Sequence, residues 1–138
     1  MSLIQMLFGF HGRLRRLHYW LAAFGSSFAL STALIITFSV LSAVLGFSQG
    51  RTAQPVVISV LCLLALVYLV LMFWIGLALQ VKRWHDRDKS GVWVLIGFVP
   101  LVGPLWSLIE CGFLDGTEGP NQFGPSPKGI TGPPPVRI

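Results

Sequence analysis

Three long stretches of the chain contain no Lys, Arg, Asp or Glu, and short polar segments separate them. The first runs for 34 residues from Leu17 to Gly50, the second for 30 residues from Thr52 to Val81, and the third for 20 residues from Ser90 to Ile109. An α-helix needs about 20 largely apolar residues to cross the hydrocarbon core of a bilayer. The pattern therefore predicts three transmembrane helices, at about residues 19–47, 55–81 and 91–113.

The third stretch differs from the other two because Pro100, Gly103 and Pro104 interrupt it near its middle. Proline removes a helical hydrogen bond and glycine weakens a helix, so this span is expected to be kinked. The alternative is a re-entrant hairpin, which enters and leaves the bilayer on the same side.

The two ends of the chain have a different pattern. Residues 1–11 are mostly apolar and uncharged but too short to cross, which predicts a short interfacial segment. After Asp115 the chain becomes rich in glycine, proline and polar residues. We therefore expect one all-α integral membrane domain over residues 1–115 and an irregular Gly/Pro-rich tail over residues 116–138.

Composition favours the membrane interpretation. The chain of 138 residues is 54% hydrophobic and only 11% charged, whereas soluble domains carry about 25% charged residues. The first stretch is too long for a cleavable signal peptide, so we expect it to remain in the protein. Cys62 and Cys111 lie within or at the end of apolar stretches and are interpreted as membrane-buried thiols, with no disulfide.

The basic residues flank the apolar stretches. Two clusters are Arg13, Arg15 and Arg16, and Lys82, Arg83, Arg87 and Lys89; the remaining cations are Arg51, Lys128 and Arg137. With the N-terminus in the cytoplasm, seven Lys and Arg residues would lie on cytoplasmic segments and three on outer segments. Because cytoplasmic segments carry the excess of Lys and Arg, this distribution predicts a cytoplasmic N-terminus. The tail would lie outside if the third stretch crosses and in the cytoplasm if it re-enters. No nucleic-acid motif accompanies the charges, so nucleic acid is not an expected partner.

Three short motifs lie around these stretches. They are Phe10-x-Gly12-Arg13-x-x-Arg16-x-x-Tyr19-Trp20, Arg83-Trp84-His85-Asp86-x-x-x-Ser90-Gly91 and Asn121-Gln122-Phe123-Gly124-Pro125-Ser126-Pro127. In this order they resemble the bacterial membrane family known as domain of unknown function 805, over about residues 10–127. The resemblance implies a small multi-pass protein of the bacterial inner membrane, with no established activity. The chain departs from the family pattern at Trp84, Gln122 and Ser126, where aliphatic, basic and acidic residues are common.

Polar residues at the expected cytoplasmic face are candidates for a binding site. Two arginine clusters brought together by the first two spans would form a basic pocket, suited to an anionic phospholipid headgroup, another anionic ligand or a protein partner. The candidate residues are Gly12, Arg13, Arg16, Arg83, His85, Asp86 and Ser90, with Asn121, Gly124 and Pro125 in the tail motif. The simpler interpretation is that the arginines are only topology signals, that Asp86 pairs with Lys82, and that Ser90 caps the third helix.

Two other classes of function are alternatives. His85, Asp86 and Ser90 could form the nucleophile system of a membrane hydrolase, although adjacent helical residues point about 100° apart. Glu110, at the end of the third stretch, could face the cavity of a small oligomeric transporter or channel. The pattern favours a binding or accessory module over an enzyme. Its protein partner could be another protein or a second copy of the chain in a homo-oligomer.

Metal binding has little support in the sequence. His85 and Asp86 could act with His18 or His11, but these residues show no recognisable ligand spacing. Neither a metal nor a cofactor is therefore expected, and membrane lipids are the expected partners.

Overall fold

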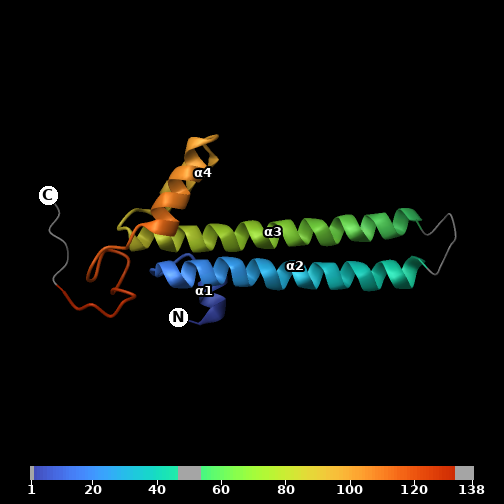
Figure 1. Cartoon of the computed structure of the whole chain (residues 1–138), viewed down its shortest axis with the longest axis horizontal. Coiled ribbons are helices and arrows are strands. Elements are labelled where there is room, and N and C mark those ends of the chain that lie inside the picture. Colours follow the sequence, from blue (N-terminus) through green and yellow to red (C-terminus); the bar gives the residue numbers. More distant parts are fainter. Residues whose placement is uncertain (1, 47–53, 133–138) are drawn as a thin grey trace. The chain divides into compact units, whose positions relative to one another are not determined.

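The computed structural model describes residues 2–46 and 54–132 (Figure 1). In this part of the chain the regular structure is helical, apart from one isolated bridge between Asn121 and Gly124. In chain order the elements are α1 (Leu3–Phe8), α2 (Arg16–Gly46), α3 (Gln54–Asp86), the 3₁₀ helix η1 (Gly91–Phe98), α4 (Val102–Ser107) and the π-helix η2 (Leu108–Phe113). Arg51 and Arg137, which entered the count of charges, lie outside the described residues.

The first two apolar stretches form the long helices α2 and α3. Pro55 lies in the first turn of α3, where its missing N–H costs nothing. By length and composition, residues 16–44 and 55–86 can each cross a membrane. At about 1.5 Å per residue both segments exceed the roughly 30 Å of hydrocarbon, so their charged ends reach the headgroup region. The predicted all-helical fold is confirmed with these two apolar helices.

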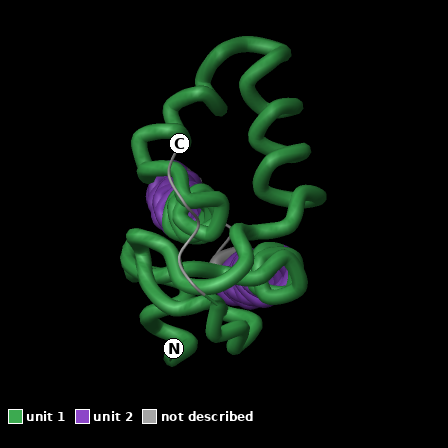
Figure 2. Tube along the Cα trace, turned by 90° about the vertical axis from the view of Figure 1, so that its left-hand side faces the viewer, with its two compact units in different colours: residues 1–23, 75–138 green, residues 24–74 purple. Residues whose placement is uncertain are grey.

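The chain divides into two compact units (Figure 2). Unit 2 comprises residues 24–74 and holds the adjoining parts of α2 and α3, which run in opposite directions. The hydroxyl groups of Ser31 and Tyr68 lie 3.0 Å apart and join the two helices. The described residues of this unit carry no charge, and most of their large apolar side chains are exposed, as expected for a surface in contact with lipid.

Unit 1 comprises residues 1–23 and 75–138 and contains the remaining elements. The short helix α1 begins with a capping box in which Ser2 and Gln5 satisfy each other's backbone N–H groups. A small core lies at the end of α3, where Trp84, Val94 and Cys111 are buried. Tyr19, Leu77, Val81 and Ile96 pack around it. The tail beyond η2 has no helix within its described residues.

The third apolar stretch folds back on itself within unit 1. Its first arm is η1 and its second arm is α4 followed by η2, with a tight turn at residues 99–101. A Cβ atom on Gly103 would lie 1.9 Å from the carbonyl oxygen of Ile96, so the two arms are in backbone contact. The stretch is not one continuous helix, and the predicted count of three spans is not confirmed. The physical reason is the interruption at residues 100–104. Pro100 and Pro104 cannot continue a regular helix, and Gly103 permits the close approach of the two arms.

Candidate functional site

A buried cluster of three charged side chains lies where the segment before α2 meets the end of α3. One carboxylate oxygen of Asp86 accepts a hydrogen bond from Arg13 Nε at 3.0 Å, and the other accepts one from Arg83 Nη1 at 2.6 Å. The side chains of Arg13, Arg83 and Asp86 are 2%, 0% and 5% exposed. Buried ion pairs are stable only when their remaining donors are also satisfied, so the other contacts of the two arginines decide what this cluster can do.

Arg13 binds the tail. Its Nη1 donates to the carbonyl oxygen of Gly119 and its Nη2 to that of Thr117, each at 2.7 Å. The backbone N–H of Thr117 in turn donates to the Asp86 carbonyl at 2.8 Å. Gly116 lies directly against Asp86, because a Cβ atom there would be 1.9 Å from a carboxylate oxygen. The tail is therefore held through its backbone, and a side chain larger than hydrogen does not fit at position 116.

Arg83 binds two further segments. Its Nε donates to the carbonyl oxygen of Cys111 at 2.6 Å, its Nη1 to that of Leu14 at 3.0 Å, and its Nη2 to that of Leu114 at 2.7 Å. These carbonyl dipoles compensate the second arginine, for which Asp86 alone supplies too little negative charge. The donors of Arg13 and Arg83 therefore face inward and already have acceptors.

His85 lies between the N-terminal segment and the tail motif. Its ring stacks on Phe123 with centroids 3.9 Å apart, and its Nδ1 lies 3.2 Å from the carbonyl oxygen of Gly12. Asn121 Nδ2 donates to the His85 carbonyl at 2.8 Å. Gly12 and Gly124 have φ angles of 91° and 130°, a region that favours glycine, and this explains both glycines.

Glu110 lies at the base of the hairpin and has two cationic partners. Arg87 Nε is 2.9 Å from one carboxylate oxygen and Lys89 Nζ is 2.8 Å from the other. The Lys89 ammonium also lies over the rings of Trp84 and Trp93, at 5.2 and 5.1 Å from their centroids. Both oxygens of Glu110 are thus occupied within unit 1, and no observation on the described residues favours a transport role for it.

Arg16 joins a second, exposed set of charges. Its Nη2 lies 2.9 Å from Asp115, which Lys128 Nζ also approaches at 3.0 Å. The hydrogen bond from Lys128, together with the charge of Arg16, lowers the pKa of Asp115 below its ordinary value. The carboxylate is therefore ionised at neutral pH, and the contact is lost only as the pH falls through that lowered pKa. Because these side chains are about half exposed, the pairs contribute little to stability.

The residues of the hydrolase alternative do not form a catalytic arrangement. Both oxygens of Asp86 are directed at arginines, while His85 Nδ1 faces Gly12, so Asp86 does not orient the imidazole. Ser90 is exposed at the start of η1. Among the described residues, no three His, Cys, Asp or Glu side chains gather to hold a metal ion.

Two local predictions from the sequence are wrong. Lys82 does not pair with Asp86; its Nζ donates instead to the carbonyl oxygens of Gln5, at 2.9 Å, and Met6. Both carbonyls belong to the last turn of α1, where a lysine side chain can bind exposed backbone acceptors, and the Gln5 carbonyl also accepts from the backbone N–H of Gly9 at 3.1 Å. Ser90 occupies the N-cap position of η1, but its side chain makes no capping hydrogen bond.

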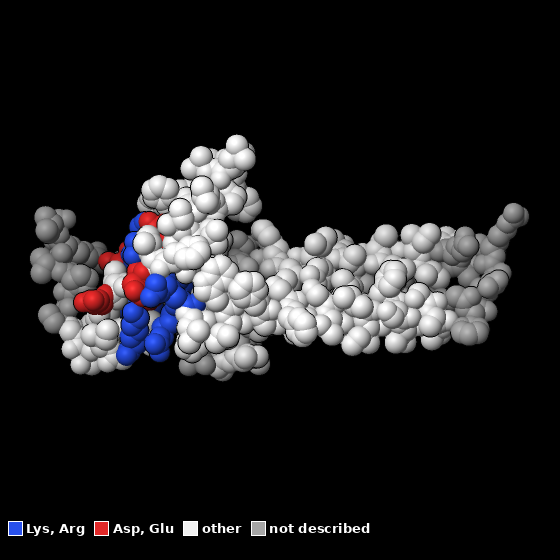
Figure 3. All heavy atoms as spheres, in the orientation of Figure 1, with Lys and Arg blue, Asp and Glu red and all other residues white. Residues whose placement is uncertain are grey.

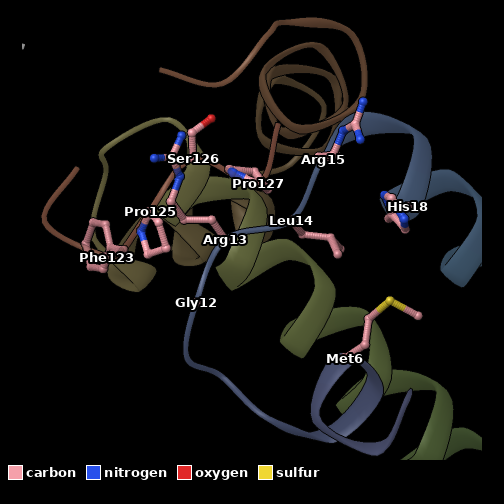
Figure 4. Close-up of a pocket in the computed structure, with 10 residues that line it drawn as sticks. All are labelled: Met6, Gly12, Arg13, Leu14, Arg15, His18, Phe123, Pro125, Ser126 and Pro127. Atoms are coloured by element: carbon pink, nitrogen blue, oxygen red, sulfur yellow. The ribbon is translucent and has the colours of Figure 1, made fainter. Parts of the chain in front are cut away.

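A cavity of about 460 Å³ opens beside the buried cluster (Figure 4). Arg15, just before α2, and His18, in its first turn, lie on the side away from Phe123, and Ser126 is drawn between Phe123 and Arg15. Both Arg15 and His18 are exposed, and in the described part of the chain Arg15 forms no ion pair with a carboxylate. The rest of the wall consists of Met6, Gly12, Arg13, Leu14, Phe123, Pro125 and Pro127. The cavity thus combines an apolar wall with the imidazole of His18 and with Arg15, a cation that has no carboxylate partner among the described residues.

The structure brings together most of the candidate residues. Seven of them lie together in and around the buried cluster: Gly12, Arg13, Arg83, His85, Asp86, Asn121 and Gly124. Pro125 lines the cavity, and Arg16 pairs with Asp115. Ser90 is exposed and does not join either group.

Sequence reasoning missed Arg15 and His18 as cavity residues. The sequence pattern indicated Arg15 only as a topology signal and His18 only as a metal ligand without supporting spacing. Their spacing of three residues at a helix start could have placed them on one side of α2. It also missed Thr117 and Phe123, because nothing local marks a backbone acceptor or a stacking partner.

Known proteins resemble this chain along most of its length. Residues 7–125 match the family described as protein of unknown function (DUF805). The inner membrane proteins YhaI and YhaH of Escherichia coli strain K12 are 34% and 32% identical to the chain over 130 residues. These alignments cover 93% of the chain and 93% and 94% of the relatives. The uncharacterized protein YiiR of the same strain is 27% identical and covers 90% of the chain. No solved structure matches.

Proposed function

The chain belongs to the DUF805 family of membrane proteins, and we propose that it is a binding module for an anionic phospholipid headgroup at the cytoplasmic face of the inner membrane. The cavity beside Arg15 and His18 carries this proposal, because it combines an apolar wall with an imidazole and with an arginine that has no carboxylate partner among the described residues. As a membrane protein the chain is in contact with lipids. The proposal concerns which lipid it selects.

The chemistry of the cavity suits the headgroup of a phospholipid. Arg15 and His18 would bind the phosphate, and Ser126 would contribute a hydroxyl to it. Met6 and Leu14 offer apolar contact to the glycerol and upper acyl carbons. A volume of about 460 Å³ falls in the range of small-molecule sites, which are concave and mostly apolar with a few polar groups.

The buried cluster has a positioning role in this proposal. Arg13 and Arg83 are closed to an outside anion, because their donors are directed at Asp86 and at backbone carbonyls. They hold the tail wall of the cavity against its α2 wall. Gly12, His85 and Asn121 extend the same support toward Phe123.

A cytoplasmic N-terminus fits this role. Every Lys and Arg among the described residues lies in unit 1, on the segments that flank the spans and in the tail. Translocation of Lys and Arg is opposed, so these segments belong in the cytoplasm. The cytoplasmic leaflet also carries the negative surface potential that attracts such residues.

Native mass spectrometry of the purified chain tests the proposal with equimolar phosphatidylglycerol and phosphatidylcholine. Wild-type protein is expected to retain the anionic lipid preferentially, and Arg15→Gln should weaken that preference about fivefold, since one cation near an anionic headgroup contributes about 1 kcal/mol. Lys128→Gln is the matched control, because it removes the same charge from the tail outside the lining of this cavity. An equal loss in both variants would show unspecific attraction and refute the site.

A second arm separates a lipid headgroup from a soluble anion. Free glycerol phosphate is titrated against the bound phosphatidylglycerol of the wild-type protein. The proposal expects little displacement at millimolar concentrations, because the soluble compound lacks the apolar part that Met6 and Leu14 would contact. If glycerol phosphate displaced the bound phosphatidylglycerol at a concentration equal to that of the lipid, the cavity would be a site for small phosphates instead.

A further inference from the structure

We propose that η1, α4 and η2 form a re-entrant hairpin, which enters the acyl chains of the cytoplasmic leaflet and returns to the same surface. The chain then crosses the bilayer twice, and the tail lies on the same side as α1. This inference does not depend on lipid binding in the cavity.

The two arms of the hairpin begin and end at one place. Val94 near the start of the first arm and Cys111 near the end of the second both pack against Trp84. At the other end, Gly103 contacts the backbone of Ile96, which closes the arms against each other. A segment closed in this way has both of its ends on one side of the bilayer.

The surface of the hairpin suits hydrocarbon. No charged residue lies between Ser90 and Ile109, and Leu101 at the turn is 89% exposed. Other large apolar side chains exposed on the hairpin are Val92, Leu95, Phe98, Val102 and Leu105. Contiguous apolar surface of this kind is rare against water and marks contact with a partner or a membrane. The charges at the base of the hairpin indicate that its apolar surface contacts lipid acyl chains.

Those charges mark the level at which the hairpin leaves the headgroup region. Arg87, Lys89 and Glu110 form ion pairs at its base, while the rest of its surface is uncharged (Figure 3). Ile96 of the first arm packs at the same core as Leu77, which lies in the apolar part of α3 before its charged last turns. The hairpin therefore begins at the charged end of α3, and its turn lies away from the charged groups (Figure 1).

The arms are too short to cross the bilayer. Eight residues of 3₁₀ helix in η1 rise about 16 Å, at about 2.0 Å per residue, and this is about half of the 30 Å hydrocarbon core. The turn also suits a medium without water. Pro100 and Pro104 have no N–H to leave unsatisfied, and the N–H groups of Val99, Val102 and Gly103 have carbonyl acceptors.

The chain that leaves the hairpin returns to the buried cluster. Leu114 accepts a hydrogen bond from Arg83, and Thr117 binds both Arg13 and Asp86. Arg13 precedes α2, so the tail and the N-terminal segment occupy the same side of the membrane.

Cysteine accessibility tests the proposal in the full-length chain with Cys62→Ala. The native Cys111 can stay, because its side chain is fully buried and closed to the reagent. Single Ser2→Cys, Leu101→Cys and Thr131→Cys variants are treated with a membrane-impermeant maleimide in spheroplasts and in inverted inner-membrane vesicles. Ser2 and Thr131 are both exposed in the folded chain.

The proposal expects the Ser2→Cys and Thr131→Cys variants to react in inverted vesicles and not in spheroplasts. The Leu101→Cys variant should react in neither, and should react after denaturation in detergent. Reaction of the Thr131→Cys variant from the outside alone, with the Ser2→Cys variant reacting from the inside, would show a third crossing and overturn the proposal. Rapid reaction of the Leu101→Cys variant in either preparation would place the turn in water, with the same consequence. Reaction of both variants from the outside alone, Ser2→Cys and Thr131→Cys, would place the hairpin in the outer leaflet and overturn its assignment to the cytoplasmic leaflet.

Discussion

Among the described residues, Asp86 is the one carboxylate to which two buried arginines donate. We predict that Asp86→Asn lowers the free energy of unfolding by about 3–5 kcal/mol, because it leaves Arg13 and Arg83 as buried charges without a counter-ion. Asparagine keeps the shape of the side chain, so the loss would report charge and not packing. Unfolding in mild detergent, followed by tryptophan fluorescence, measures the change.

Asp88→Asn is the control for that measurement. It removes the same charge two residues later, at a site with no ion pair among the described residues and a φ of 57° that asparagine tolerates. A change within about 0.5 kcal/mol is expected. Equal stability of the Asp86→Asn and wild-type proteins would mean that the buried ion pairs do not hold the fold.

The importance of these residues could be predicted from the sequence, but their contacts could not. Arg13, Arg83 and Asp86 stand out because they are charged residues next to long apolar stretches. Their pairing was not foreseeable, because 73 positions separate Arg13 from Asp86 and the acceptors in the tail are backbone carbonyls. The wrong pairing of Asp86 with Lys82 followed from helical spacing alone, which takes no account of the backbone carbonyls in the last turn of α1.

At the level of elements, the hairpin depends on one close backbone approach. We predict that Gly103→Ala destabilises unit 1 by about 1–3 kcal/mol, because its Cβ would overlap the Ile96 carbonyl and force the arms apart. Gly97→Ala is the control in the facing arm, where the new Cβ would meet Ser107 Oγ at an ordinary 3.6 Å. Thermal unfolding in detergent compares the two variants. If both unfold at the wild-type temperature, the arms do not pack as described.

The sequence predicted the long helices better than the hairpin. α2 and α3 follow from stretches without charge, because length and apolarity are enough to form a membrane helix. Pro100, Gly103 and Pro104 indicated an interruption of the third stretch, and the re-entrant form was an alternative to a kinked span. Whether the stretch forms a kinked span or a re-entrant hairpin depends on the contacts of Ile96, Trp84 and Cys111, and the hydropathy pattern does not predict these contacts.

For the whole molecule, the family resemblance predicted an inner-membrane protein, and the similarity to YhaI and YhaH confirms its membership of that family. The docking of the tail was not predicted, because its Gly/Pro-rich composition indicated only irregular structure. Backbone groups of Thr117 and Gly119 bind it to Arg13, and this contact creates one wall of the cavity.

Photo-crosslinking in a native bacterial membrane tests the central claim most directly. A photoreactive phenylalanine analogue replaces Met6 in the cavity wall, which leaves Arg15 and His18 intact, and a second chain carries it at the exposed Phe28 of α2 as the control. Mass spectrometry then identifies the attached lipids. The account predicts that anionic phospholipids are enriched at position 6 over position 28; the same lipid distribution at both positions would contradict it.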